Sequence, residues 1–96
     1  MKVRYTPRAQ ADLDTVYAYL DQRAPVAAIA VKQLIERRIE SLAAFPFVAP
    51  ATDHPAIREL TVVRYPFKIY YRVAGDEVHI LHIRHTSRRP WTDERD

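Results

Sequence analysis

Apolar and polar positions alternate along much of the second half of the chain. From residue 67 to residue 73 the apolar side chains occupy every second position, which is the period of a strand with one buried face. Residues 78–85 are rich in β-branched and large apolar side chains, and Gly75 lies in a turn signal between the two runs. Leu60 and Val62 indicate a further strand before them. Residues 58–91 are therefore predicted to form a three-stranded antiparallel meander.

The alternation is ambiguous in the last of these strands. Val78 and Ile80 point one way in a regular strand, whereas Leu81 and Ile83 point the other. We expect either a β-bulge or burial on both faces of this strand to resolve the conflict.

A helical period replaces the alternation in the first half of the chain. Residues 2–6 predict a short strand, after which Thr6 and Pro7 match a helix cap and a first helical position. Apolar residues then share one helical stripe: Ala9, Leu13, Val16, Tyr17 and Leu20. Three acidic residues are predicted to face away from it: Asp12, Asp14 and Asp21.

A second helix is predicted to start at about Pro25, because a proline disfavours a helical conformation at the preceding Ala24. Its apolar stripe comprises Ala28, Val31, Ile35, Ile39 and Leu42. The break between the helices is short, so an antiparallel helical hairpin is expected. The loop at residues 44–57 then leads to the meander, with Phe45 and Phe47 as expected core anchors.

The order of these elements predicts an α+β fold. An N-terminal strand, a helical hairpin and a three-stranded antiparallel meander form one domain over residues 1–96, with the hairpin packed on one face of the sheet. The sequence has no cysteine, no signal peptide and no apolar run long enough to cross a bilayer. We therefore expect a cytoplasmic protein that uses no disulfide or thiolate metal site.

Most of the positive charge is concentrated in the predicted meander. Residues 58–91 hold seven basic and three acidic side chains, whereas the whole chain has a net charge of +3. Such a face could bind a polyanion or an acidic protein segment, although an exposed antiparallel face is normally polar in any case. The candidate binding residues are Arg58, Arg64, Lys68, Tyr70, Arg72, Arg84, Arg88, Arg89 and Trp91.

Three histidines near the end of the chain raise the question of a metal. In a regular strand His79 and His85 lie roughly 20 Å apart and His82 points to the opposite face, so they cannot bind one ion. We expect no metal and no cofactor. Either His82 or His85 could instead transfer protons near neutral pH.

Ribonuclease chemistry requires such a proton-transfer group together with cations around the reacting phosphate. The candidate set for this reaction is His85, Arg58, Arg64 and Arg88. The pattern is not specific, because basic and aromatic residues alternate on strands in many domains that cleave nothing.

Several strings of this sequence resemble the RelE/ParE superfamily of toxins from bacterial type II toxin–antitoxin modules. They are VRYTPRAQADLDTVYAYL at the start, IESLAAFP after the second helix, and RELTVVRYPFKIYYRV and VHILHIRHTSRRPW in the meander. The resemblance covers nearly the whole chain. The glycine that often follows the loop proline in this superfamily is absent here, where Phe47, Val48 and Ala49 follow Pro46.

The resemblance implies a growth-arresting toxin that forms a hetero-oligomer with its antitoxin. The antitoxin neutralises the toxin through a flexible, net-acidic segment that folds on binding. Relatives of the ParE, or plasmid-stabilisation, type inhibit DNA gyrase, and RelE-like relatives cleave messenger RNA in the ribosome. RelE-like relatives commonly place a Tyr, or a His and a Tyr, near the C-terminus, whereas all six tyrosines here lie at or before Tyr71. The last residues are acidic and would repel the phosphates of ribosomal RNA. Both features favour the ParE-like branch over the ribosome-dependent endoribonuclease.

Overall fold

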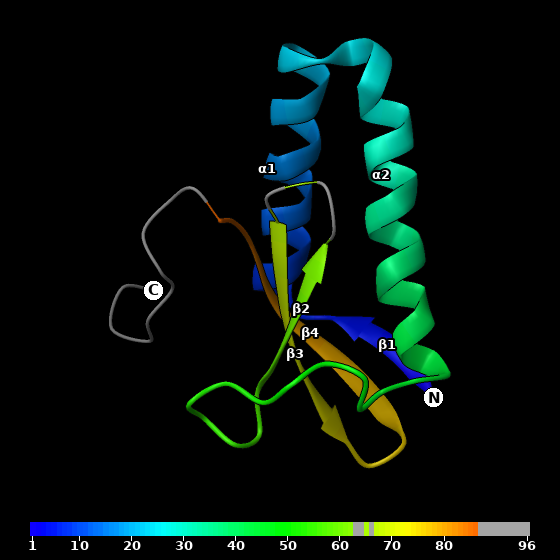
Figure 1. Cartoon of the computed structure of the whole chain (residues 1–96), viewed down its shortest axis with the longest axis vertical. Helices are drawn as coiled ribbons and strands as arrows, with labels where there is room; N and C mark the ends of the chain where they lie inside the picture. Colours follow the sequence, from blue (N-terminus) through cyan, green and yellow to red (C-terminus); the bar gives the residue numbers. More distant parts are fainter. Residues whose placement is uncertain (63–64, 66, 87–96) are drawn as a thin grey trace.

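The computed structural model describes residues 1–62, 65 and 67–86. Its elements are the strand β1 (Lys2–Tyr5), the helices α1 (Pro7–Arg23) and α2 (Pro25–Glu40), a single 3₁₀ turn η1 (Ser41–Ala43), and the strands β2 (Arg58–Val62), β3 (Phe67–Ala74) and β4 (Glu77–His85). Figure 1 shows α1 and α2 side by side as a hairpin whose far end extends past the strands. The predicted α+β class and element order are confirmed.

The predicted start of α1 and the predicted break between the helices are both present. The Thr6 hydroxyl accepts a hydrogen bond from the Ala9 N–H at 3.1 Å, and Pro7 occupies the first helical position. The chain leaves helical geometry at Ala24, where φ is −148°, and Pro25 begins α2. Both helix boundaries therefore follow from local sequence chemistry.

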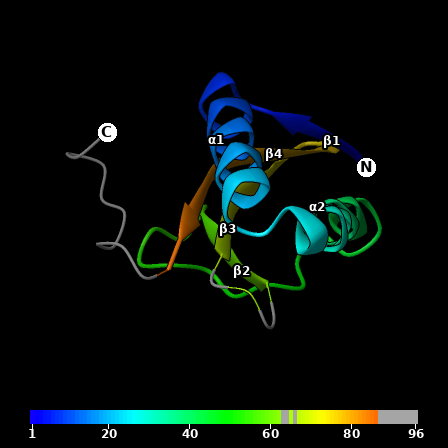
Figure 2. The same cartoon turned by 90° about the horizontal axis from the view of Figure 1, so that it is seen from above.

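The sheet has the strand order β1-β4-β3-β2, so the N-terminal strand lies beside the last one. Strand β1 runs parallel to β4, while β2, β3 and β4 form the predicted antiparallel meander. Seen from above, α1 and α2 lie on the same side of β2 and β3 (Figure 2). The core fills the space between these layers, and its largest fully buried side chains are Tyr71, Ile35, Ile39, Leu42, Ile69 and Ile80.

A β-bulge resolves the ambiguous register of β4. Tyr70 pairs with His82 and Tyr71 pairs with Ile80, which leaves Leu81 as an extra residue. Ile80 and Ile83 are both buried as a result, whereas Leu81 is only half-buried. The bulge also places His82 on the same face as His79, so the prediction of opposite faces is wrong: it assumed an uninterrupted strand.

The loop between α2 and β2 corrects a second prediction. Phe45 and Phe47 are 66% and 60% exposed, so they are not core anchors. Leu42 and Ala49 enter the core instead, and the Tyr71 hydroxyl accepts a hydrogen bond from the Ala49 N–H at 3.4 Å. The ring of Phe47 instead lies under the guanidinium of Arg58, at 5.0 Å.

Candidate functional site

The sheet face opposite the helices carries a hydrogen-bonded group of polar side chains from three strands. Across neighbouring strands, Glu59 of β2 pairs with Tyr70 of β3, and Lys68 of β3 pairs with Arg84 of β4. Lys68 Nζ lies 2.7 Å from Glu59 Oε1, and Arg84 Nε donates to the Tyr70 hydroxyl at 3.2 Å. We call these four residues the sheet cluster. Three of its members, Lys68, Tyr70 and Arg84, are predicted binding residues, and the structure brings them together.

Glu59 is the acidic centre of the sheet cluster. Burial acts to raise the pKa of its carboxyl group, but hydrogen bonds from Lys68 and Tyr70 and the positive charges of Lys68 and Arg84 outweigh burial. The pKa of Glu59 is therefore lower than usual. The carboxylate partly neutralises the cations at the place where an anionic ligand would approach.

Tyr70 connects the sheet cluster to helix α1 through His82. The two rings stack with centroids 5.8 Å apart and an interplanar angle of 16°. His82 Nδ1 lies 2.5 Å from a carboxylate oxygen of Asp12, which also accepts a hydrogen bond from the Ile83 N–H at 3.2 Å. Asp12, which was predicted to face away from the apolar stripe of α1, instead turns toward β4. Asp12 binds the edge of β4 just beyond the end of β1.

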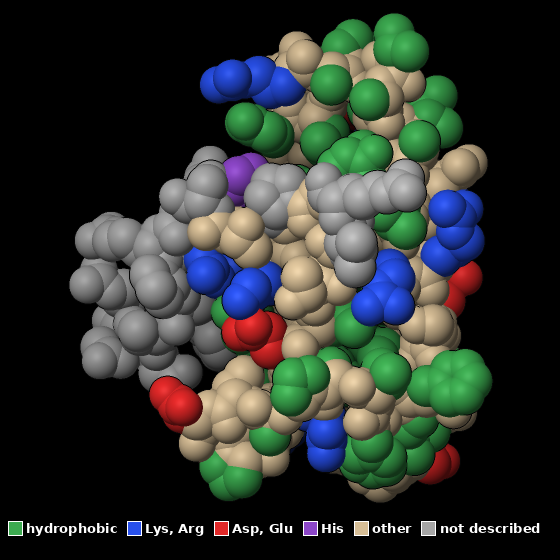
Figure 3. Space-filling view, viewed as in Figure 1, with side chains coloured by type: hydrophobic (Ala, Val, Ile, Leu, Met, Phe, Trp, Pro, Cys, Tyr) green, Lys and Arg blue, Asp and Glu red, His purple; other side chains and the backbone are tan. Residues whose placement is uncertain are grey.

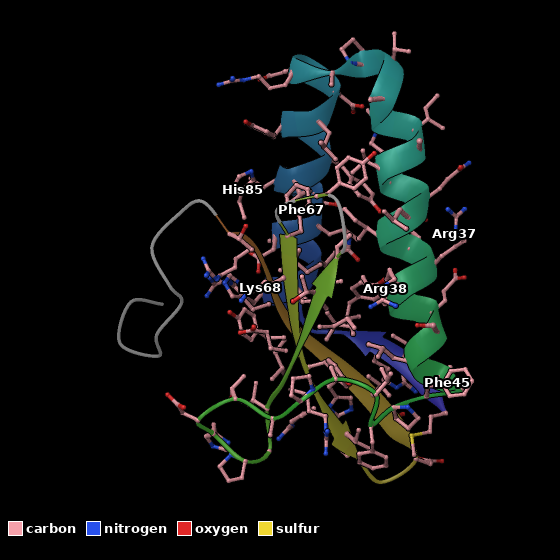
Figure 4. The ribbon with its side chains drawn as sticks, in the orientation of Figure 1. Arg37, Arg38, Phe45, Phe67, Lys68 and His85 are labelled. Atoms are coloured by element: carbon pink, nitrogen blue, oxygen red, sulfur yellow. The ribbon has the colours of Figure 1, made fainter. Side chains whose placement is uncertain are left out.

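A pocket of about 270 Å³ lies between α1 and the end of β4. We call it the α1–β4 pocket. It is lined by Arg8, Asp12, Thr15, Val16, Tyr19, Phe67, His82, Ile83, Arg84 and His85. Figure 4 shows His85 and Phe67 at the same end of the sheet, and their rings meet edge to face with centroids 5.3 Å apart. The ring of Tyr19 lies 6.1 Å from that of His85.

Arg58 does not belong to either group. It shares the helix-facing side of β2 with Leu60 and Val62, beneath the loop. Its guanidinium donates to the Ala49 carbonyl at 2.6 Å and lies over the Phe47 ring at 5.0 Å. Arg58 therefore holds the loop in place.

Arg58 is also far from the other candidate ribonuclease residue that the structure describes. Arg58 pairs with Tyr71, whereas His85 pairs with Phe67. Because these two partners are four residues apart on β3, the two pairs lie about 13 Å apart along that strand. The structure does not bring Arg58 and His85 together.

The remaining predicted residues lie elsewhere. Arg72 is exposed on the sheet face opposite the helices and pairs with His79. Near it, hydrogen bonds from His79 and Arg4 lower the pKa of the Glu77 carboxyl group. Arg64, Arg88, Arg89 and Trp91 lie outside the described residues.

Sequence reasoning missed Arg8, Asp12 and Tyr19 because they lie on the polar side of a helix, far in sequence from β4. The spacing of Arg8 and Asp12 by one helical turn was a weak signal, and their ion pair at 3.3 Å is present. In the described part of the chain, no group of three or more His, Asp or Glu residues could hold a metal ion. No helix described here is long and apolar enough to span a bilayer.

A separate surface lies at the far end of the helical hairpin. Figure 3 shows hydrophobic side chains gathered there. Residues 24–31 carry no charge, and Val26 and Ile29 are 94% and 66% exposed. We call Val26 and Ile29 the hairpin tip. Contiguous exposed apolar side chains of this kind are typical of protein interaction sites.

The structure is a small α+β domain with a polar sheet face and an apolar hairpin tip. Residues 3–90 match the family described as the ParE toxin of the type II toxin–antitoxin system parDE. The chain belongs to this family, within the RelE/ParE superfamily of type II toxins.

Individual relatives agree with the family. The chain is 40% identical over 90 residues to Toxin RelE2 of Caulobacter vibrioides, a match that covers 91% of this chain and 97% of that one. It is similar to a chain of the chromosomal ParDE toxin–antitoxin system of P. aeruginosa, with 32% identity, a TM-score of 0.77 and coverage of 88% and 95%. Protein HP0894 of Helicobacter pylori shares the fold, at 17% identity, a TM-score of 0.57 and coverage of 91% and 96%.

Proposed function

We propose that this toxin inhibits DNA gyrase, arrests growth, and is neutralised by a cognate antitoxin in a hetero-oligomer. Membership of the ParE toxin family supports this function, as does the similarity to a chain from a ParDE system. The antitoxin contributes a flexible, net-acidic segment that folds on the toxin. The cations on the sheet favour such a segment, since complementary charge accelerates association.

The two candidate ribonuclease residues that the structure describes, Arg58 and His85, guide the choice of target. Cleavage of RNA requires proton-transfer groups and cations around one phosphate. Here Arg58 binds loop carbonyls at one end of the sheet, while His85 packs against aromatic rings at the other. This arrangement favours binding of a protein over hydrolysis of RNA.

The hairpin tip is the surface that we assign to the gyrase contact. It is apolar and lies on the first two turns of α2, away from the sheet cluster. A target bound there buries Val26 and Ile29, which are highly exposed in the toxin alone. Target and antitoxin then use different parts of the molecule.

The test is a supercoiling and cleavage assay with purified gyrase and toxin freed of antitoxin. We expect cleaved, gyrase-linked DNA to accumulate, and expression in cells to trigger DNA-damage signalling and filamentation before translation falls. A folded toxin with no effect at large molar excess would overturn the gyrase assignment. A harmless wild-type chain would overturn toxicity itself.

The second candidate is a ribosome-dependent messenger RNA endoribonuclease. Its support is the 40% identical relative named Toxin RelE2, together with the grouping of Lys68, Tyr70 and Arg84 on one face. This function predicts rapid translation arrest and messages cut at ribosomal positions. It fails if folded His85→Ala and Arg64→Ala variants remain fully toxic.

A further inference from the structure

We propose that the α1–β4 pocket is an anchor site for the antitoxin, and that it receives one bulky apolar side chain whose neighbours in the antitoxin are acidic. This inference rests on the antitoxin partner of the proposed function. It adds the place on the toxin and the chemistry of the residue that binds there.

The lining of the pocket is divided between an apolar floor and a polar rim. Val16, Phe67 and Ile83 form the floor and are at most 8% exposed. Arg8, Thr15 and Tyr19 stand exposed at the rim. A buried apolar floor surrounded by polar side chains is the usual environment of an energetically dominant anchor in a protein interface.

The volume and the ring geometry decide which kind of group fits. A pocket of about 270 Å³ is smaller than the roughly 300–1,000 Å³ of sites that enclose a whole small molecule, so it takes one part of a larger partner. A nucleic-acid base needs a flat face on which to stack. The rings of Tyr19 and Phe67 instead stand at 68° and 88° to that of His85. The three rings therefore surround a concave space that suits a bulky side chain better than a flat base.

The charges at the pocket specify the flanking chemistry. Arg8 and Arg84 contribute two permanent positive charges, and Asp12 contributes one negative charge. Asp12 is engaged with Arg8 and His82, where it fixes α1 against β4. The formal charges of these lining side chains total +1, which favours an acidic over a basic flanking segment.

Filling the pocket from its rim tests the inference. The probe is the protein encoded beside this chain's gene, titrated calorimetrically against the full-length toxin. Thr15→Phe places a ring over the pocket, and we expect it to weaken binding at least about tenfold. Ala18→Phe adds the same ring one helical turn along α1, outside the pocket lining, and should bind like the wild type.

A charge variant provides an independent measurement if Thr15→Phe does not fold. Arg8→Gln should weaken binding by roughly three- to tenfold and flatten its salt dependence, whereas Arg37→Gln, exposed on α2 and outside the pocket lining, should do neither. Both variants lose one positive charge, so the difference reports position rather than net charge.

The outcomes distinguish failure of the antitoxin partner from failure of the pocket assignment. No binding to the wild-type toxin would overturn the antitoxin partner, and this inference with it. Equal binding by the wild type, Thr15→Phe and Arg8→Gln would overturn the pocket assignment alone. If Thr15→Phe left antitoxin binding unchanged but abolished binding of a single-stranded oligonucleotide, the pocket would belong to nucleic acid and the inference would be wrong.

Discussion

Asp12 of helix α1 and His82 of strand β4 form a contact of 2.5 Å that joins the helical layer to the bulged edge of the sheet. The same carboxylate accepts the Ile83 N–H. The side chains of Asp12 and His82 are only 18% and 8% exposed, so water screens this contact poorly. Both residues line the α1–β4 pocket, so their contact fixes the helical side of the pocket against its strand side.

Asp12→Ala removes the acceptor shared by His82 and Ile83. Loss of a charged, largely buried acceptor should lower the free energy of unfolding by about 2–3 kcal/mol. Urea denaturation followed by circular dichroism measures the change. Asp14→Ala, exposed on the same helix, should change stability by less than about 0.5 kcal/mol. Equal losses in both variants would contradict a specific role for Asp12.

The bulge at Leu81 predicts unequal effects at two neighbouring apolar positions. Ile80 is fully buried, so Ile80→Ala should cost about 2–5 kcal/mol. Leu81 is the extra, half-buried residue, and Leu81→Ala should cost about 1 kcal/mol or less. Both are measured by chemical denaturation. A larger loss at Leu81 would place the bulge elsewhere in β4.

The lowered pKa of Glu59 links the stability of the sheet cluster to pH. A carboxyl group whose folded-state pKa is depressed stabilises the fold above its unfolded-state value, near 4.5, and this contribution disappears as pH falls through the folded-state pKa. The stability difference between the wild type and Glu59→Gln should therefore be full at neutral pH and shrink below pH 4.5. Urea unfolding across this range measures it. In a Lys68→Gln background the pKa of Glu59 should be higher, as followed by carboxyl NMR titration.

Arg58→Ala tests whether this residue holds the loop or serves in catalysis. Losing the hydrogen bond to the Ala49 carbonyl should lower stability by about 1–2 kcal/mol and increase amide exchange in residues 44–57, with toxicity retained. Arg72→Ala, exposed on the other sheet face, should leave loop exchange unchanged. A folded Arg58→Ala variant without toxicity would favour the ribonuclease alternative.

Val26→Asp and Ile29→Asp test the hairpin tip as the gyrase contact. An acidic residue in the first turns of a helix is tolerated or slightly stabilising, so neither variant should lose more than about 0.5 kcal/mol of stability. Each should lose at least about tenfold in gyrase inhibition while binding antitoxin normally. Gln33→Asp, exposed further along the same helix, introduces the same charge and should stay active.

The sequence by itself determined the elements, their order and most of their buried faces. Helical and strand periods, the Thr6 cap, the Pro25 restart and the Gly75 turn depend on interactions between neighbours in sequence. Gly75 indeed has a φ of +61°, which glycine adopts without strain. These features could be predicted because their physical causes are local.

Only the tertiary structure decided where the site residues meet. The pairing of β1 with β4, the bulge at Leu81 and the contact between Asp12 and His82, 70 positions apart, arise from long-range packing. The same packing turned Phe45 and Phe47 outward and placed the Arg58 guanidinium against the carbonyl of Ala49 in the loop. The alternation of side chains along a strand predicts which of them share a face only as far as the next β-bulge, where the alternation shifts by one residue. The composition of the α1–β4 pocket therefore could not be derived from residue patterns alone.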